Sequence, residues 1–95
     1  MTTYTPPDHA HRHARAAKHR ATYAKGTGHA AYAMALHRAH ECQQLAAQCE
    51  AMWESASQAD DHYAADARRK EAVKLQDKAY QSLLGVERAI KGRVQ

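Results

Sequence analysis

Alanine supplies 22 of the 95 residues, and this excess constrains the fold more than any other feature of the sequence. Leucine, isoleucine and valine together contribute only nine residues, and phenylalanine is absent. A β-sandwich or a doubly wound sheet needs more bulky apolar side chains than this, whereas alanine has the highest helix propensity of all residues. The composition therefore predicts an all-α protein built from alanine-rich helices.

A first helix is predicted over about residues 7–25. Thr5-Pro6-Pro7-Asp8 is typical of a helix start, because proline fits the first turn and an acidic third residue completes a cap. Gly26 can end this helix in the left-handed conformation. Alanine recurs every three or four residues along one face, which predicts a narrow buried stripe. The stripe consists of Ala10, Ala14, Ala17, Ala21 and Ala24.

Two longer helices are predicted after this break, over about residues 29–56 and 58–91. Ser57 and Asp60 indicate a capping box, which favours a hairpin turn near 55–57, although one continuous rod stays open because no glycine or proline occurs there. The apolar stripe of the second helix has a heptad period, and that of the third is close to 3.6 residues. The stripes are Ala31, Ala35, Cys42, Leu45, Cys49, Met52, Ala56, Ala59 and Tyr63, and then Ala72, Leu75, Ala79, Leu83, Val86 and Ile90.

These elements predict a single helical domain over residues 1–95. It consists of a short basic N-terminal helix and a long antiparallel helical hairpin, packed as a small helical bundle or coiled coil. Gly85 and Gly92 predict a frayed C-terminal end, because glycine destabilises helix interiors. Small domains with few large apolar side chains commonly oligomerise. We therefore expect a homodimer, or a chain that becomes ordered on a partner.

Charge is segregated along the chain. Residues 1–40 carry a net charge of +5, residues 41–67 a net −6 and residues 68–95 a net +5. An antiparallel hairpin is expected to place Glu41 close to Lys70–Lys74, so that the acidic block neutralises its own neighbours. The basic first helix has no acidic run to match it. It is therefore the best candidate for an external contact, where charge sets steering and specificity.

These features favour a non-enzymatic protein-binding module that acts as an inhibitor or adaptor of a larger protein partner, of the kind that a phage or plasmid encodes. The sequence contains no nucleophile elbow, no phosphate-binding glycine loop and no paired carboxylates in an apolar context, so neither an enzyme nor a cofactor is predicted. The predicted contacts are a basic face (Arg12, Arg15, Lys18 and Arg20), an acidic face (Glu50, Glu54, Asp60 and Asp61) and two apolar anchors (Trp53 and Tyr63).

Two alternative functions use other properties of the chain. A nucleic-acid-binding accessory protein would contact phosphates through the basic first helix and stack a base on Tyr23. A metal-binding protein would use His9 with His13, or His37 with His40, because imidazoles about one helical turn apart can chelate zinc, nickel or copper. A structural site normally needs four ligands and no single face supplies them, so solvated histidines are favoured and no metal is predicted. The eight histidines also raise the possibility of a pH switch.

Cys42 and Cys49 lie seven residues apart, which places them on one helix face about 10.5 Å apart along the axis. They cannot bridge one another, so they are expected to be small buried residues, with an intermolecular disulfide as the alternative. Two cysteines indicate a reducing cytoplasm. The first eight residues lack the apolar core of a signal peptide, and no stretch approaches about 18 apolar residues, so no membrane contact is expected.

Overall fold

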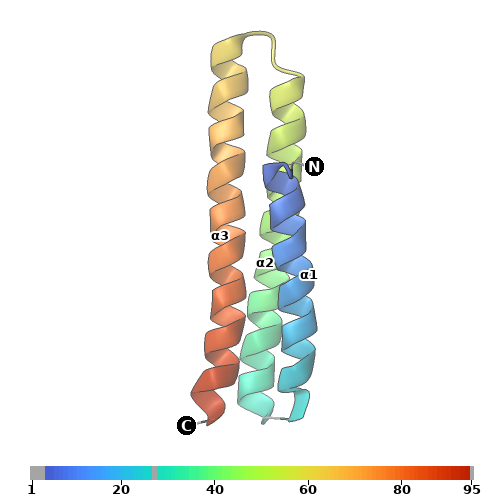
Figure 1. Ribbon diagram of the computed structural model, residues 1–95, viewed down its shortest axis with the longest axis vertical. Helices are drawn as coiled ribbons and strands as arrows, with labels where there is room; N and C mark the ends of the chain where they lie inside the picture. Colours follow the sequence, from blue (N-terminus) through green and yellow to red (C-terminus); the bar gives the residue numbers. More distant parts are fainter. Residues whose placement is uncertain (1–3, 27, 95) are drawn as a thin grey trace.

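The computed structural model describes residues 4–26 and 28–94, and every regular element within these ranges is helical. Helices α2 and α3 form an antiparallel hairpin, and α1 packs against both of them (Figure 1). The predicted architecture, a short N-terminal helix followed by a long helical hairpin, is therefore confirmed. The elements are α1 (Pro6–Tyr23), the 3₁₀ turn η1 (Ala24–Gly26), α2 (His29–Ser57) and α3 (His62–Val94).

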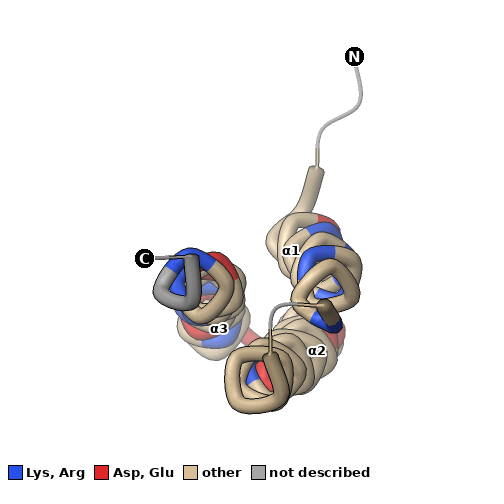
Figure 2. The backbone as a smooth tube through the Cα atoms, turned by 90° about the horizontal axis from the view of Figure 1, so that it is seen from below, with Lys and Arg blue, Asp and Glu red and all other residues tan. Residues whose placement is uncertain are grey.

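The bundle is elongated, with extents of 51 × 28 × 16 Å. Seen along its length, the three helices stand at the corners of a triangle (Figure 2). Because α1 is the shortest helix, the end of the hairpin that carries the α2–α3 turn projects beyond the start of α1 (Figure 1). In the part of the chain that the structure describes, none of the helices combines the length and apolarity needed to cross a membrane.

The predicted start of α1 is confirmed by its cap. The Asp8 amide donates to Thr5 Oγ1 at 3.4 Å, and the Asp8 carboxylate accepts from the Thr5 amide at 3.0 Å. All five alanines of the predicted stripe are buried. The prediction of a left-handed Gly26 is wrong: among the described residues the positive φ belongs to Gly28, at 132°, where the chain turns from η1 into α2.

The seam between α2 and α3 contains the largest buried side chains. Val86, Cys42 and Cys49 are fully buried, and Leu75 and Leu83 are buried beside them. The predicted stripe of the third helix is confirmed, with its last member only partly buried. The second helix buries a different face from the one that the heptad predicts, because it packs on two neighbours rather than one. Of the predicted stripe, four residues are buried (Ala35, Cys42, Cys49 and Ala56), four are only partly buried (Ala31, Leu45, Met52 and Ala59), and Tyr63 is exposed. The additional buried residues are Ala39 and Ala46.

The hairpin turn falls at residues 58–61, later than the sequence indicates. The Ser57 hydroxyl donates back to the Glu54 carbonyl at 2.7 Å and does not cap α3. The Asp61 carboxylate instead accepts from the Ala64 amide at 2.8 Å, so the prediction of a Ser57–Asp60 box is wrong. At the other end, α3 continues past Gly85 to Val94, contrary to the prediction of a frayed end there.

Candidate functional site

Three polar contacts fix α1 in its place on the hairpin. On the α2 side, His11 Nε2 lies 3.0 Å from Glu50 Oε2. On the α3 side, Arg20 Nη1 pairs with Glu87 Oε1 at 3.1 Å, and the Gln76 amide lies 2.9 Å from His13 Nε2. The buried alanine stripe sets the inner face of α1, and these longer side chains beside it add polar contacts to both helices of the hairpin.

The four residues of the predicted basic face divide into two groups. Arg12, Arg15 and Lys18 are exposed and have no acidic partner within the described residues, and the Arg12 guanidinium lies 4.5 Å from the centre of the Tyr4 ring. Arg20 lies on the flank and pairs with α3. Lys and Arg positions are visible along the outer side of α1 in Figure 2. The outward cations of α1 are therefore Arg12, Arg15 and Lys18.

The four residues of the predicted acidic face lie in different settings. Glu50 faces α1 and contacts His11, and Asp61 caps α3. Glu54 and Asp60 are exposed, and their carboxylates have no cationic partner in residues 4–26 and 28–94. The unengaged acidic groups of this set therefore lie at the end of the molecule that carries the hairpin turn (Figure 1).

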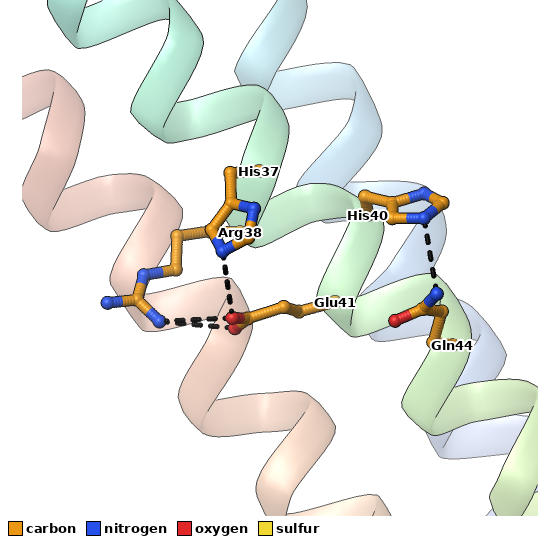
Figure 3. Close-up of polar contacts among 5 residues, drawn as sticks. All are labelled: His37, Arg38, His40, Glu41 and Gln44. Carbon is orange, nitrogen blue, oxygen red and sulfur yellow. Dashed lines mark hydrogen bonds and ion pairs between the residues drawn. The ribbon is translucent and has the colours of Figure 1, made fainter.

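The register of the hairpin explains why the acidic block does not meet the lysines of α3. Cys42 lies opposite Ala79, so Glu41 is level with Tyr80 and not with Lys70–Lys74. Its carboxylate contacts Arg38 and His37 of its own helix at 3.1 and 3.2 Å (Figure 3). The predicted proximity of Glu41 to those lysines is wrong, because the turn lies farther along the chain than 55–57.

The two predicted apolar anchors differ sharply in exposure. Trp53 is partly buried and packs against the core, so it stabilises the bundle from within. Tyr63 is 90% exposed at the beginning of α3, next to the hairpin turn. Of these two anchors, Tyr63 is thus the one that presents its ring to solvent, and it lies outside the buried stripe predicted for it.

The histidines named as metal candidates are not brought together. His9 lies against Tyr4, with the two rings tilted and their centres 5.6 Å apart, while His13 is engaged with α3. His37 turns to Glu41, but His40 turns to the Gln44 amide at 3.2 Å (Figure 3). Within residues 4–26 and 28–94, no group of three or more His, Cys, Asp or Glu residues is arranged to hold a metal ion.

Burial shifts the pKa of three side chains. Cys42 and Cys49 are buried as predicted, and their thiols donate to the Ala79 and Ala72 carbonyls at 3.1 Å. Their burial raises the pKa of each thiol to about 11, which leaves both protonated at neutral pH. Partial burial, followed by the nearby positive charges of α1, lowers the pKa of His13.

A groove that is not evident from the sequence lies between α2 and α3, near the end of the bundle where η1 leads into α2. It has a volume of about 490 Å³ and combines two arginines with neutral polar and apolar groups. The sequence signal that points to it is Gly85, a glycine inside a helix that continues on both sides. Its main lining residues are Met34, Arg38, Gln81, Ser82, Gly85 and Arg88.

No family model, curated protein or solved structure matches this chain.

Proposed function

We propose that the protein is a non-enzymatic binding module that docks onto a larger protein partner through the outer face of α1 and acts there as an inhibitor or adaptor. The observation that carries this proposal is the outward orientation of Arg12 and Arg15, exposed and without acidic partners in the described chain. Their neighbours His11, His13 and Arg20 are instead engaged with the bundle. A fixed row of unpaired cations favours an acidic partner surface through steering and specificity.

The end of the hairpin provides a second contact region in this proposal. Tyr63 is exposed there, close in sequence to the unpaired carboxylates of Glu54 and Asp60. Aromatic side chains are enriched among the residues that dominate interface energies. A basic helix face and an acidic tip that carries an aromatic residue would orient the module on its partner, because the two regions favour opposite charges.

The proposal is tested by affinity capture from lysate with a C-terminal tag that contains no histidines, with and without nuclease. We expect a stoichiometric protein that survives nuclease treatment and is lost with the double variant Arg12→Glu/Arg15→Glu. The matched control is Lys70→Glu/Lys74→Glu, which reverses two exposed charges on α3 and should retain the partner. Equal capture by both double variants would contradict docking through α1.

Nucleic-acid binding is the second candidate, and a specific arrangement favours it. Tyr23 is 71% exposed and meets His19 edge-on, with ring centres 5.1 Å apart, so aromatic rings accompany the cations along α1. Bases stack on such rings while cations contact phosphates. In this case the captured material would be nucleic acid, its binding would fall steeply with salt, and Asp60→Asn/Asp61→Asn would leave it intact or improve it.

Self-association and a cytoplasmic location are also part of the proposal. Leu45 and Met52 are only partly buried on α2, nearer the hairpin turn than Met34, and a second copy that covers them would form a homodimer. Sedimentation equilibrium tests this by giving twice the monomer mass of 10.6 kDa. The cytoplasmic location rests on the cysteine content, because two cysteines are too few for a disulfide scaffold.

A further inference from the structure

The groove between α2 and α3 contains a glycine whose missing side chain has a definite use. A Cβ placed on Gly85 would lie 3.3 Å from Arg38 Cδ and 3.6 Å from its Nε. The stem of Arg38 therefore crosses from α2 and lies directly on the backbone of α3. Glycine is unfavourable inside a helix, so this close approach is a physical reason for its presence in the middle of α3.

The guanidinium of Arg38 is held from one side only. Its Nη1 donates to both carboxylate oxygens of Glu41, at 3.1 and 3.4 Å, and Glu41 is also contacted by His37. Among the described residues, Nη2 and Nε of Arg38 have no partner. Figure 3 shows the second terminal nitrogen pointing away from Glu41, in front of α3. The pair thus orients an arginine whose remaining donors are available to the groove.

Arg88 supplies a second guanidinium from α3. It is exposed and has no acidic partner within the part of the chain that is described. Because Glu41 offsets the charge of Arg38, the net positive charge of the groove comes from Arg88. Gln81 and Ser82 add neutral donors to the same lining. Donors that approach from two helices suit a tetrahedral oxyanion with several oxygens, and arginine forks bind phosphate with defined geometry.

The size and the apolar wall of the groove indicate a ligand that is larger than an inorganic anion and has an apolar part. Its volume of about 490 Å³ lies within the range of small-molecule sites, roughly 300–1,000 Å³. Met34, half-exposed, and Ala89 line it with apolar surface. We propose that this groove binds the phosphate group of a small phosphorylated organic molecule, with Arg38 and Arg88 on the phosphate and Met34 against its apolar part. The site is separate from the outer face of α1 and does not depend on partner docking.

The probe for this site is phenyl phosphate, titrated into the full-length ¹⁵N-labelled protein and followed by NMR. We expect saturable shifts at the Gly85 and Ser82 amides and at the Nε–H groups of Arg38 and Arg88. Arg88→Gln should weaken binding roughly tenfold, as expected for the loss of a charge-assisted hydrogen bond. The matched control, Lys74→Gln, removes one exposed charge elsewhere on α3 and should bind like the wild type.

Two further ligands separate the contribution of the phosphate group to binding from that of the apolar part. Inorganic phosphate should bind at the same resonances but more weakly than phenyl phosphate, and benzyl alcohol should not bind. The proposal is overturned if phenyl phosphate shifts the arginines of α1 as much as those of the groove, if Arg88→Gln and Lys74→Gln bind alike, or if inorganic phosphate binds as tightly as phenyl phosphate. Arg88 is exposed, so its substitution leaves the fold intact and the test remains decisive.

Discussion

Helix α1 and the α2–α3 hairpin belong to one bundle but are held by different kinds of side chain. The buried face of α1 consists of alanines and Pro7, whereas the hairpin seam buries Leu75, Leu83, Val86 and the two cysteines. Full burial of a leucine or valine contributes about 1.5–3 kcal/mol, and each methylene-sized group about 0.8 kcal/mol. The hydrophobic attraction that holds α1 is therefore weaker per turn than the attraction within the hairpin.

A helix with almost no large apolar groups can still be held in a defined position. The alanine stripe lets α1 approach both neighbours closely, and the polar contacts of His11, His13 and Arg20 guide the helix from either side of that stripe. The hairpin needs no such guidance, because Leu, Val and Cys side chains fill its seam. The proposed docking face thus lies on the helix that is held less strongly. Disrupting the α1–hairpin interface and the α2–α3 seam in separate variants tests this difference in attachment.

The largest effect is expected from Ala79→Glu, which places a carboxylate in the fully buried hairpin seam. An unpaired buried charge costs about 3–5 kcal/mol, a large part of the stability of a small domain. We expect loss of cooperative thermal unfolding by far-ultraviolet circular dichroism. Lys78→Glu is the control, because it changes an adjacent exposed position and should melt cooperatively. A cooperative Ala79→Glu melt close to that of the wild type would show that the seam does not hold the fold together.

A smaller and local effect is expected from Ala17→Glu in the buried face of α1. The charge should expel α1 while α2 and α3 remain folded, because the seam between them is untouched. Hydrogen exchange by NMR should show protection in 6–23 falling by at least roughly tenfold, with protection in 62–94 retained. Lys18→Glu, exposed beside it, should leave both intact. Loss of protection in all three helices together would mean that the hairpin depends on α1.

The helices with a regular apolar repeat could be predicted from the sequence. The exact position of the hairpin turn, and with it the register of α2 against α3, could not. The alanine stripe of α1 repeats regularly at three or four residues, and the helix has a complete cap at Thr5, so both features are evident in the sequence. The turn at 58–61 contains neither glycine nor proline, so the sequence favours Ser57 as the cap, whereas the structure uses Asp61. An earlier turn shifts the expected register of the hairpin and therefore the expected neighbours of Glu41.

The candidate site was predictable to a similar extent. Basic residues on α1 are evident from composition, but the sequence does not show that Arg20 turns to Glu87 while Arg15 remains unpaired. The role of Gly85 was hidden as well. A glycine near the end of a helix is read locally as fraying, whereas its space here is used by a side chain from another helix, Arg38. Contacts between distant positions of this kind have no signal in the local sequence.

The buried thiols predict a loss of hairpin stability at alkaline pH. Burial raises the pKa of Cys42 and Cys49 from 9.0 to about 11, so the folded state holds these protons more tightly than the unfolded state. Their contribution is complete below pH 9 and is lost as the pH rises towards 11. We expect a decrease on the order of 1 kcal/mol for each thiol in urea unfolding between pH 8 and 10.5.

Other groups also titrate in that range, so the control for the thiols is Cys42→Ala/Cys49→Ala, measured at the same pH values. The double variant should be less stable at pH 8, because it loses two buried hydrogen bonds, but it should lose less additional stability at pH 10.5. If both proteins lose the same stability over this range, the thiols do not titrate within a folded seam.

The smallest effect concerns α1 at acidic pH and depends on His13. This ring is partly buried against α3, 5.1 Å from the centre of the Tyr80 ring. Its lowered pKa means that the unfolded chain takes up a proton near pH 6.5 while the folded chain does so only at lower pH. The contribution of His13 to the docking of α1 is therefore complete above about pH 6.5 and decreases as the pH falls from there through the lowered pKa. The decrease is less than about 1 kcal/mol, because this group is partly exposed.

Hydrogen-exchange protection factors at pH 7.5 and 5.5 measure this effect separately in α1 and α3. In the wild type, protection of α1 should decrease at pH 5.5 relative to α3, and His13→Gln should reduce that decrease because the amide does not titrate. His19→Gln, on the exposed side of α1, should behave like the wild type. If His13→Gln has the same pH dependence as the wild type, another group controls the docking of α1 at acidic pH, and the weakening of this helix on acidification does not arise from the burial of His13.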